Sequence, residues 1–190
     1  KQTGIDGWRL DVCDEVSHAF WKKFRTFVRG INPDAAIFGE IHHQSNAFLR
    51  GDELDGIMNY PLYDAVLGFF ANRSIGGERF ADEIASKRML YSDVMKRSML
   101  NLVGSHDTER FLTSCGGRES RLKLAEVFQF TYVGVPYIYY GDEAGLSGGN
   151  DPGCRACMPW EPGKQDRGLL EFFRKLAKLR KENRVLVYGG

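Results

Sequence analysis

Cysteine is scarce in this sequence, and long apolar segments are absent. Four cysteines in 190 residues are too few for a disulfide scaffold, and the C-x-x-C pair Cys154 and Cys157 has no second pair with which to complete a tetrahedral metal site. Ordinary reduced thiols are therefore favoured over zinc binding or redox chemistry. No apolar run approaches the roughly 20 residues of a membrane span, and the opening residues KQTGIDG lack the regions of a signal peptide. The sequence predicts a soluble protein, which we place in the cytoplasm.

An excess of either charge is also missing. The 26 basic and 25 acidic residues are interspersed and leave a formal net charge of +1. Nucleic acid or an anionic membrane would call for a clustered basic surface, so we expect neither as a partner. No predicted strand is followed by G-x-G-x-x-G or G-x-x-x-x-G-K-[ST], which leaves a nucleotide-binding interpretation without support.

The sequence does contain the material for a sizeable core. Hydrophobic residues make up 43% of the chain, and its 13 Phe, 8 Tyr and 3 Trp suit both a thick core and stacking against sugar rings. Short apolar runs alternate with longer segments of helical period, the pattern of a parallel sheet wrapped by helices. The runs predict strands over 7–12, 35–41, 56–60, 98–104 and 135–141. The helical period predicts helices over 16–28, 61–72, 78–97, 118–133 and 166–183, the first with an apolar stripe of Val16, Phe20, Phe24 and Phe27.

Five strand-and-helix units do not close a barrel by themselves. An eight-stranded βα barrel needs about 250 residues, so we predict the α/β class in the form of a partial TIM-type (β/α)8 barrel, with an open doubly wound sheet as the alternative. The chain starts on a strand almost at once and ends on the apolar run VLVY, so we expect a piece of a longer protein. We assign 1–183 to the barrel and 184–190 to the start of a following all-β domain.

Three carboxylates occupy one kind of position in this pattern. Asp11 and Glu40 lie near the ends of the first two predicted strands, and Asp107 comes just past the fourth. Any one of them alone would be read as a helix cap or a solvated loop acid. The carboxyl ends of barrel strands form one active face, so three acids at equivalent positions predict a shared pocket.

The environments of the first two acids predict opposite ionisation. Side chains alternate along a strand, so Arg9 and Asp11 point to the same side. The positive charge of Arg9 should keep Asp11 ionised, as a covalent nucleophile must be. Glu40 lies between Gly39 and Ile41 at the end of an apolar strand, where low polarity should raise its pKa. A retaining glycosidase uses two carboxyl groups about 5 Å apart, one with a lowered pKa as the nucleophile and one with a raised pKa as the general acid.

The segments that carry the three acids resemble motifs of a known family. GWRLD, GEI and NLVGSHDTER, in this order, resemble three signature regions of the α-amylase family, glycoside hydrolase family 13. The segments LRGDELDGIMNYPLYDAV and GVPYIYYGDEAGLSGGNDPGCRACMPW are similar to its neopullulanase, cyclomaltodextrinase and maltogenic amylase subgroup. The resemblance covers nearly the whole chain, and the motifs together are highly specific.

The resemblance implies a role for each acid. Asp11 would be the nucleophile and Glu40 the general acid and base, while Asp107 would bind sugar hydroxyls and stabilise the oxocarbenium-like transition state. Arg9 and His106 would lie beside them.

The resemblance also implies weaker candidates for substrate binding. Asp151 and Arg155 match a loop pair that contacts glucose units on the non-reducing side, although NDPGCR could equally form a self-capping Asx turn. Asn59 and Tyr60 would lie at the end of the sixth barrel strand, near the cleft. His42 stands where close relatives usually carry tryptophan, and it would offer the acceptor sugar a smaller, more polar platform.

A further departure concerns what the chain lacks. The family's earlier signature region, on the third strand, is missing. We therefore expect this chain to contain approximately strands 4 to 8 of the barrel and to have little or no activity alone.

The resemblance implies a retaining hydrolase of α-1,4 links in cyclodextrins, pullulan, starch or maltooligosaccharides. The balance between hydrolysis and transglycosylation is left open. Alternatives are an oligo-1,6-glucosidase, a debranching relative, or a non-catalytic α-glucan-binding barrel. The chemistry requires no metal or other cofactor, although the full-length protein could still bind calcium. Exposed strand edges predict a homo-oligomer.

Overall fold

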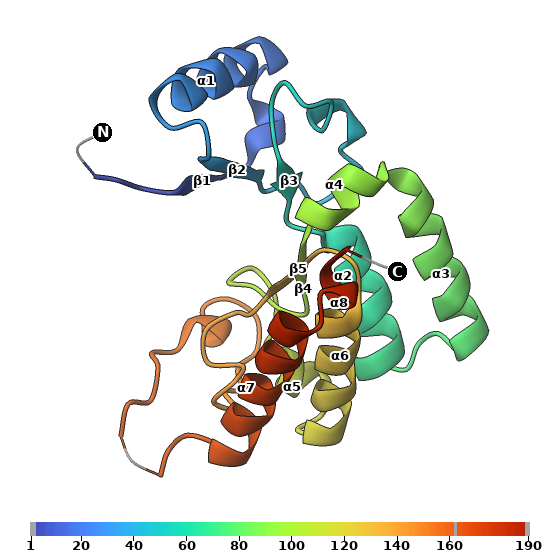
Figure 1. Cartoon of the computed structure of the whole chain (residues 1–190). Helices are drawn as coiled ribbons and strands as arrows, with labels where there is room; N and C mark the ends of the chain where they lie inside the picture. The colour runs from blue at the N-terminus through green and yellow to red at the C-terminus, as the bar shows by residue number, and fades with distance from the viewer. Residues whose placement is uncertain (1–2, 162, 189–190) are drawn as a thin grey trace.

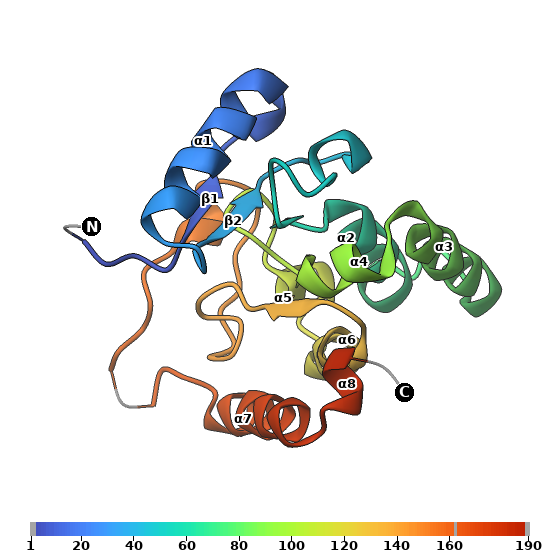
Figure 2. The ribbon, with the colours of Figure 1, turned by 45° about the horizontal axis from the view of Figure 1, so that its top comes forward.

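The computed structural model describes residues 3–161 and 163–188. Its strands are all parallel and follow one another in space in the order of the sequence (Figures 1 and 2). One sheet runs β1-β2-β3 and a second pairs β4 with β5, while a parallel bridge between Met58 and Leu100 joins β3 to β4. The strands are β1 (Gly7–Leu10), β2 (Ala36–Gly39), β3 (Gly56–Ile57), β4 (Leu100–Leu102) and β5 (Val135–Tyr137). Each predicted strand is therefore present, but shorter than its apolar run.

Helices follow the strands on the outside of this sheet. After β1 come the 3-10 turn η1 (Cys13–Glu15) and α1 (His18–Ile31); after β2, the 3-10 turn η2 (Asn46–Phe48). After β3 come α2 (Tyr60–Val66), the π-helical turn η3 (Leu67–Ala71), α3 (Gly77–Leu90) and α4 (Asp93–Ser98). After β4 come α5 (Phe111–Ser114) and α6 (Glu119–Thr131); after β5, the 3-10 turn η4 (Gly153–Arg155), α7 (Arg167–Glu182) and α8 (Val185–Tyr188).

Capping side chains decide where several helices begin. Ser17 accepts a hydrogen bond from Phe20 N at 3.4 Å, so α1 starts two residues later than its apolar period predicts. The single helix predicted over 78–97 is wrong, because Tyr91 takes an extended conformation and the Ser92 hydroxyl, accepting from Met95 N at 3.3 Å, starts a new helix. Asp166 caps α7 in the same way.

The run VLVY also folds differently from the prediction. The sequence expects a strand over 184–190, but residues 185–188 form the helical turn α8, with Tyr188 N donating to Arg184 O at 2.9 Å. A short apolar run has no period that separates strand from helix, so local hydrogen bonding decides. Residues 189 and 190 lie outside the described part of the chain, and the following domain stays a prediction.

Two apolar clusters hold the elements together. One lies between β1, β2, β3 and α1 and includes Ile37, Ile57 and Trp21, whose indole N–H donates to Cys13 O at 2.7 Å. The other gathers α2, α6 and α7 around β4, with Phe111 and Leu169 fully buried. Helices thus pack against one side of the strands (Figure 1).

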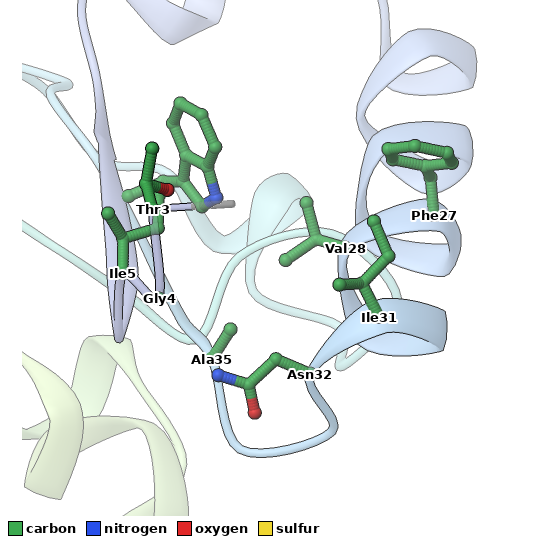
Figure 3. Close-up of a pocket in the computed structure, with 9 residues that line it drawn as sticks. Thr3, Gly4, Ile5, Phe27, Val28, Ile31, Asn32 and Ala35 are labelled. Atoms are coloured by element: carbon green, nitrogen blue, oxygen red, sulfur yellow. The ribbon is translucent and has the colours of Figure 1, made fainter. Parts of the chain in front are cut away.

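The apolar stripe of α1 is present but lies largely outside these clusters. Phe20 is 52% exposed and Phe27 is 69% exposed, while Trp21 and Val28, on the neighbouring face, are buried. Phe27 and Val28 line a cavity of about 230 Å³ with Thr3, Ile5, Trp8 and Ile31 (Figure 3). Among the described residues β1 pairs only with β2, so α1 packs against the sheet on one side and leaves the stripe open toward the free edge of β1.

Close packing at β3 yields a stability prediction. An alanine at Gly56 would put a methyl group 2.9 Å from the carbonyl carbon of Ser98, closer than real side chains approach a backbone. We expect Gly56→Ala to lower the free energy of unfolding by about 1–3 kcal/mol, as overpacking does. Urea denaturation of the protein produced from its complete coding sequence measures the change.

Gly30→Ala is the matched control. Gly30 lies exposed in α1 with open space around the added methyl group, so the same substitution should raise stability by up to about 1 kcal/mol. Equal effects at the two glycines would contradict the packing argument.

Candidate active site

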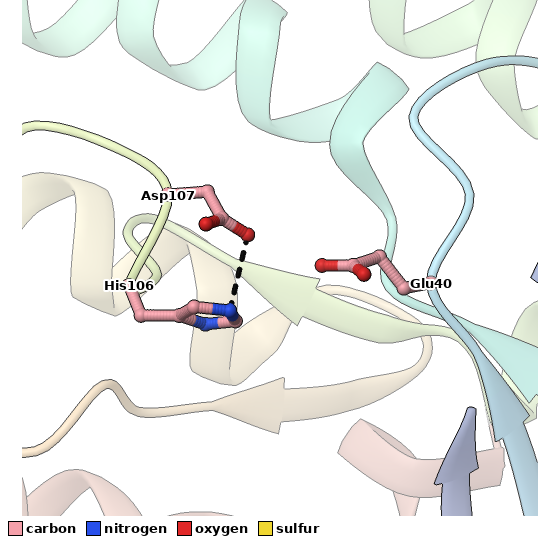
Figure 4. Close-up of side chains that lie close together, drawn as sticks. All are labelled: Glu40, His106 and Asp107. Carbon is pink, nitrogen blue, oxygen red and sulfur yellow. Dashed lines mark ion pairs between the residues drawn. The ribbon is translucent and has the colours of Figure 1, made fainter. Parts of the chain in front are cut away.

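The three predicted carboxylates lie at one edge of the sheet. Asp11 directly follows β1, Glu40 directly follows β2, and Asp107 lies in the loop after β4. The parallel register pairs Leu10 with Gly39, and Glu40 N donates to Leu10 O at 2.9 Å, so the first two acids leave their strands side by side. Side-chain atoms of Glu40, His106 and Asp107 come within 4.8 Å of one another (Figure 4). The fold therefore brings together the acids that the sequence predicts.

One guanidinium connects the first two acids. Arg9 forms an ion pair with Asp11 through Nη1 and with Glu40 through Nη2. The second Glu40 oxygen accepts a hydrogen bond from Val12 N at 3.2 Å. Glu40 is thus held on both oxygens, with 5% of its side chain exposed, whereas 76% of the Asp11 side chain is exposed.

The exposure of Asp11 corrects one expectation. The sequence suggests a buried acid within a strand over 7–12, but β1 ends at Leu10 and Val12 takes a left-handed conformation with φ of 39°. The chain turns at this point, which releases Asp11 from the pleat and frees the Val12 amide to bind Glu40. Arg9 still reaches both carboxylates from the strand.

The two acids have pKa values displaced in opposite directions. The hydrogen bond from Arg9 holds the pKa of Asp11 below its usual 3.8. Burial raises the pKa of Glu40 above its usual 4.5, outweighing the Val12 amide and the charge of Arg9, which lower it. These directions agree with those predicted from the sequence, and so do the causes, Arg9 for Asp11 and burial for Glu40.

Arg155 holds the third acid. Its Nη2 donates to Asp107 Oδ1 at 3.2 Å and its Nε to the backbone oxygen of His106 at 2.9 Å. Asp151 pairs with the same guanidinium at 3.0 Å, and His106 Nε2 lies 3.1 Å from Asp107 Oδ2. The candidate pair Asp151 and Arg155 therefore joins Asp107 and His106 in one charged group.

Two aromatic rings stand beside the acids. His42, two residues past Glu40, stacks on Tyr60 with ring centroids 3.8 Å apart and planes 16° from parallel. The Tyr60 hydroxyl lies 3.1 Å from Ser105 Oγ, and burial raises the pKa of Tyr60 to about 12, so it stays neutral. His42 is exposed and can present its outer face to a bound molecule.

Asn59 is the candidate that the structure turns inward. Its buried side chain donates to Asn101 Oδ1 at 2.9 Å, and Asn101 Nδ2 donates to Val133 O at 2.8 Å. These amides connect the end of β3 with β4 and the start of β5. The contacts of Asn59 among the described residues are structural.

Sequence reasoning missed a buried ion pair behind the site. Arg110 and Asp142 lie 3.0 Å apart with side chains 0% and 3% exposed. Burial raises the pKa of Asp142 to about 7, against the lowering effect of Arg110. Both residues lie in the quoted motifs NLVGSHDTER and GVPYIYYGDEAG, but interspersed charges in a loop carry no sign of burial.

Among the described residues, Glu40, His106 and Asp107 form the one group close enough to hold a metal ion. The expectation that no metal is needed stays a prediction. In the described part of the chain, no helix has the length and apolarity required to cross a bilayer.

Comparison with known proteins defines the class of this domain. The model of the family Alpha-amylase, described as "Alpha amylase, catalytic domain", matches residues 1–189. The chain belongs to the α-amylase family, and its α/β fold is part of that family's TIM-barrel catalytic domain.

Within this family, the chain is similar to proteins named cyclomaltodextrinase and neopullulanase. The chain is 52% identical to the cyclomaltodextrinase of Thermoanaerobacter pseudethanolicus and to neopullulanase 2 of Thermoactinomyces vulgaris, each across 100% of this chain. A solved structure titled cyclomaltodextrinase, 49% identical, superposes on 97% of this chain and 32% of its own with a TM-score of 0.95. The chain spans about a third of the length of these relatives, 33% and 32% of the two curated proteins.

The shared guanidinium makes a direct electrostatic prediction. Arg9→Gln removes the positive charge that favours both carboxylates, so the pKa of Asp11 should rise toward its ordinary value and that of Glu40 should rise further. Carboxyl-carbon NMR titration measures both. Arg79→Gln, which removes an exposed arginine that pairs with Glu83 on α3, should change neither. An unchanged Asp11 pKa in Arg9→Gln would contradict the assigned cause.

Proposed function

We propose that this chain carries the catalytic carboxylates of a retaining glycoside hydrolase. The substrates are α-1,4-glucosidic links of cyclodextrins, pullulan, starch or maltooligosaccharides, with transglycosylation as a second outcome. The observation that carries the proposal is the single guanidinium between an exposed acid of lowered pKa and a buried acid of raised pKa. Relatives named cyclomaltodextrinase and neopullulanase support the substrate class.

The chemistry assigns one step to each acid. Asp11, ionised and reachable, attacks the anomeric carbon while Glu40 gives its proton to the departing glycosidic oxygen, and a covalent glycosyl ester on Asp11 results. Glu40, now a carboxylate, takes a proton from water or from a sugar hydroxyl, whose oxygen then displaces Asp11 from the anomeric carbon. Water gives hydrolysis, and a sugar hydroxyl gives transglycosylation.

The remaining candidates would bind and orient the sugar. Asp107 and His106 face Glu40 and would accept and donate hydrogen bonds to hydroxyls of the ring under attack. Asp151 and Arg155 continue this polar group outward, toward the non-reducing side. His42 on Tyr60 forms an aromatic surface next to the acid, where an acceptor sugar could stack.

Several expectations from the sequence stay predictions. We assign the strands of this chain to positions 4 to 8 of the barrel and expect little or no turnover from the 190 residues alone. Self-association is supported by the exposed aromatic side chains of Trp8, Phe20 and Phe27, and sedimentation tests it. A cytoplasmic location and calcium in the complete protein are likewise open to direct measurement.

Replacing the nucleophile tests the proposal. Asp11→Asn keeps the size and polarity of the side chain but removes the attacking charge. In the protein produced from its complete coding sequence, kcat on maltooligosaccharides should therefore fall by more than about 10³-fold. Oligosaccharide affinity, measured by calorimetry, should stay within a few-fold. Asp34→Asn, which changes an exposed acid before β2, is the control and should keep full activity. A wild-type protein that binds α-glucans without turnover would instead favour a non-catalytic binding barrel.

A second substitution tests the acceptor surface. His42→Trp enlarges the stacking surface beside Glu40, and stronger stacking of about 0.5–1.5 kcal/mol should raise the ratio of transfer to hydrolysis about 2- to 10-fold. Product analysis at fixed maltotriose concentration measures the ratio. His43→Trp is the matched control, because His43 is the adjacent exposed histidine and faces Asp14 at 3.6 Å. An unchanged ratio in His42→Trp would contradict a role for this surface.

A further inference from the structure

Arg110 is a fully buried arginine whose side chain binds two backbone carbonyls and one carboxylate. Its Nε donates to Cys154 O at 2.9 Å, and its Nη1 donates to Tyr140 O and to Asp142 Oδ1, the latter at 3.0 Å. The guanidinium carbon lies 4.1 Å from the ring centroid of Tyr139 and 4.8 Å from that of Tyr140. Nε and Nη1 are hydrogen-bonded, while the buried Nη2 has no hydrogen-bond partner among the described residues. A buried guanidinium is costly unless it is paired, so the contacts that Nε and Nη1 do make hold the arginine and its acceptors together.

From Arg110 a short series of contacts leads to the active site. Cys154, whose carbonyl Arg110 holds, approaches His106 O with its Sγ at 3.3 Å. The next residue, Arg155, donates to His106 O and to the carboxylate of Asp107. The backbone N–H of Arg110 also donates to Gly148 O at 3.0 Å, which secures the beginning of the same loop.

We propose that Arg110 is a positioning residue, which places Arg155 and through it Asp107. With no exposed surface, Arg110 does not touch a substrate, so its effect on activity must pass through the loop that it holds. This inference rests on the proposed function only for its kinetic readout. The mechanical claim, that Arg110 orders residues 148–155, is independent of the reaction.

Arg110→Lys is the decisive variant, because lysine keeps the charge but presents a single ammonium that cannot satisfy three separated acceptors in a plane. In the protein produced from its complete coding sequence, we expect kcat/KM for maltooligosaccharides to fall about 10- to 100-fold, as misplaced catalytic groups do. In an Arg155→Ala background the same change should cost no more than about twofold, because the residue through which it acts is already gone.

Arg180 supplies a comparable control. Its guanidinium likewise donates to three acceptors, the backbone carbonyls of Phe130, Tyr132 and Gly134, but these join α7 to the end of α6 and the start of β5, at the opposite end of the strands from the acids. Arg180→Lys should lower the Tm and leave kcat/KM unchanged. A role for Arg110 in stability alone would make the two variants behave alike.

Amide hydrogen exchange separates this inference from the proposed function. Arg110→Lys should lose protection over 148–155, and Arg180→Lys should retain it. Equal protection in both variants, or the same fold-loss from Arg110→Lys with and without Arg155, would overturn the positioning role. If the wild type turns over no α-glucan, the proposed function fails and the exchange result alone decides. If Arg110→Lys does not fold, Asp142→Asn, which removes the charge partner but keeps an oxygen acceptor, replaces it in every comparison.

Discussion

The parallel register between β1 and β2 is the constraint on which the site depends. Pairing Gly7 with Ala36 and Leu10 with Gly39 makes the two strands end level with each other, so that Asp11 and Glu40 emerge at one edge. A shift of one residue would send their side chains to opposite faces of the sheet. The turn after Leu10 then separates their environments, leaving Asp11 in solvent and giving Glu40 the Val12 amide. The same pairing thus creates both the proximity of the two acids and their difference.

Electrostatics at this edge combine one shared charge with unequal burial. Arg9 favours ionisation of both carboxylates, but for Glu40 the loss of solvent outweighs that attraction. A single guanidinium can therefore contact two acids whose pKa values are displaced in opposite directions, which suits the proposed double displacement. His106 and Asp107 approach Glu40 from the loop after β4, and Arg155 donates a hydrogen bond to Asp107.

The loop that carries Arg155 shows how a surface segment is held by a buried one. The residues after β5 form turns that are closed by backbone hydrogen bonds. The guanidinium of Arg110, which contacts the rings of Tyr139 and Tyr140, adds a hydrogen bond to Cys154 O. Nearby burial also raises the pKa of Glu126, so the interior behind the site favours neutral acids. Charge is concentrated where the chain opens to solvent and is paired or neutralised where it does not.

The amino-acid sequence by itself determined the order and type of the strands and the identity of the three acids, because apolar runs, helical period and motif spacing are local properties. It also anticipated the opposed pKa directions, since Arg9 is two residues from Asp11 and Glu40 stands between apolar neighbours. Only the tertiary structure decided that one guanidinium contacts both acids, that Asn59 turns inward to Asn101, and that Phe20 and Phe27 lie exposed. It also revealed Arg110 as the buried support of the Arg155 loop. These features depend on residues that are tens of positions apart in the chain, and burial and partner choice follow from packing, which no local pattern encodes.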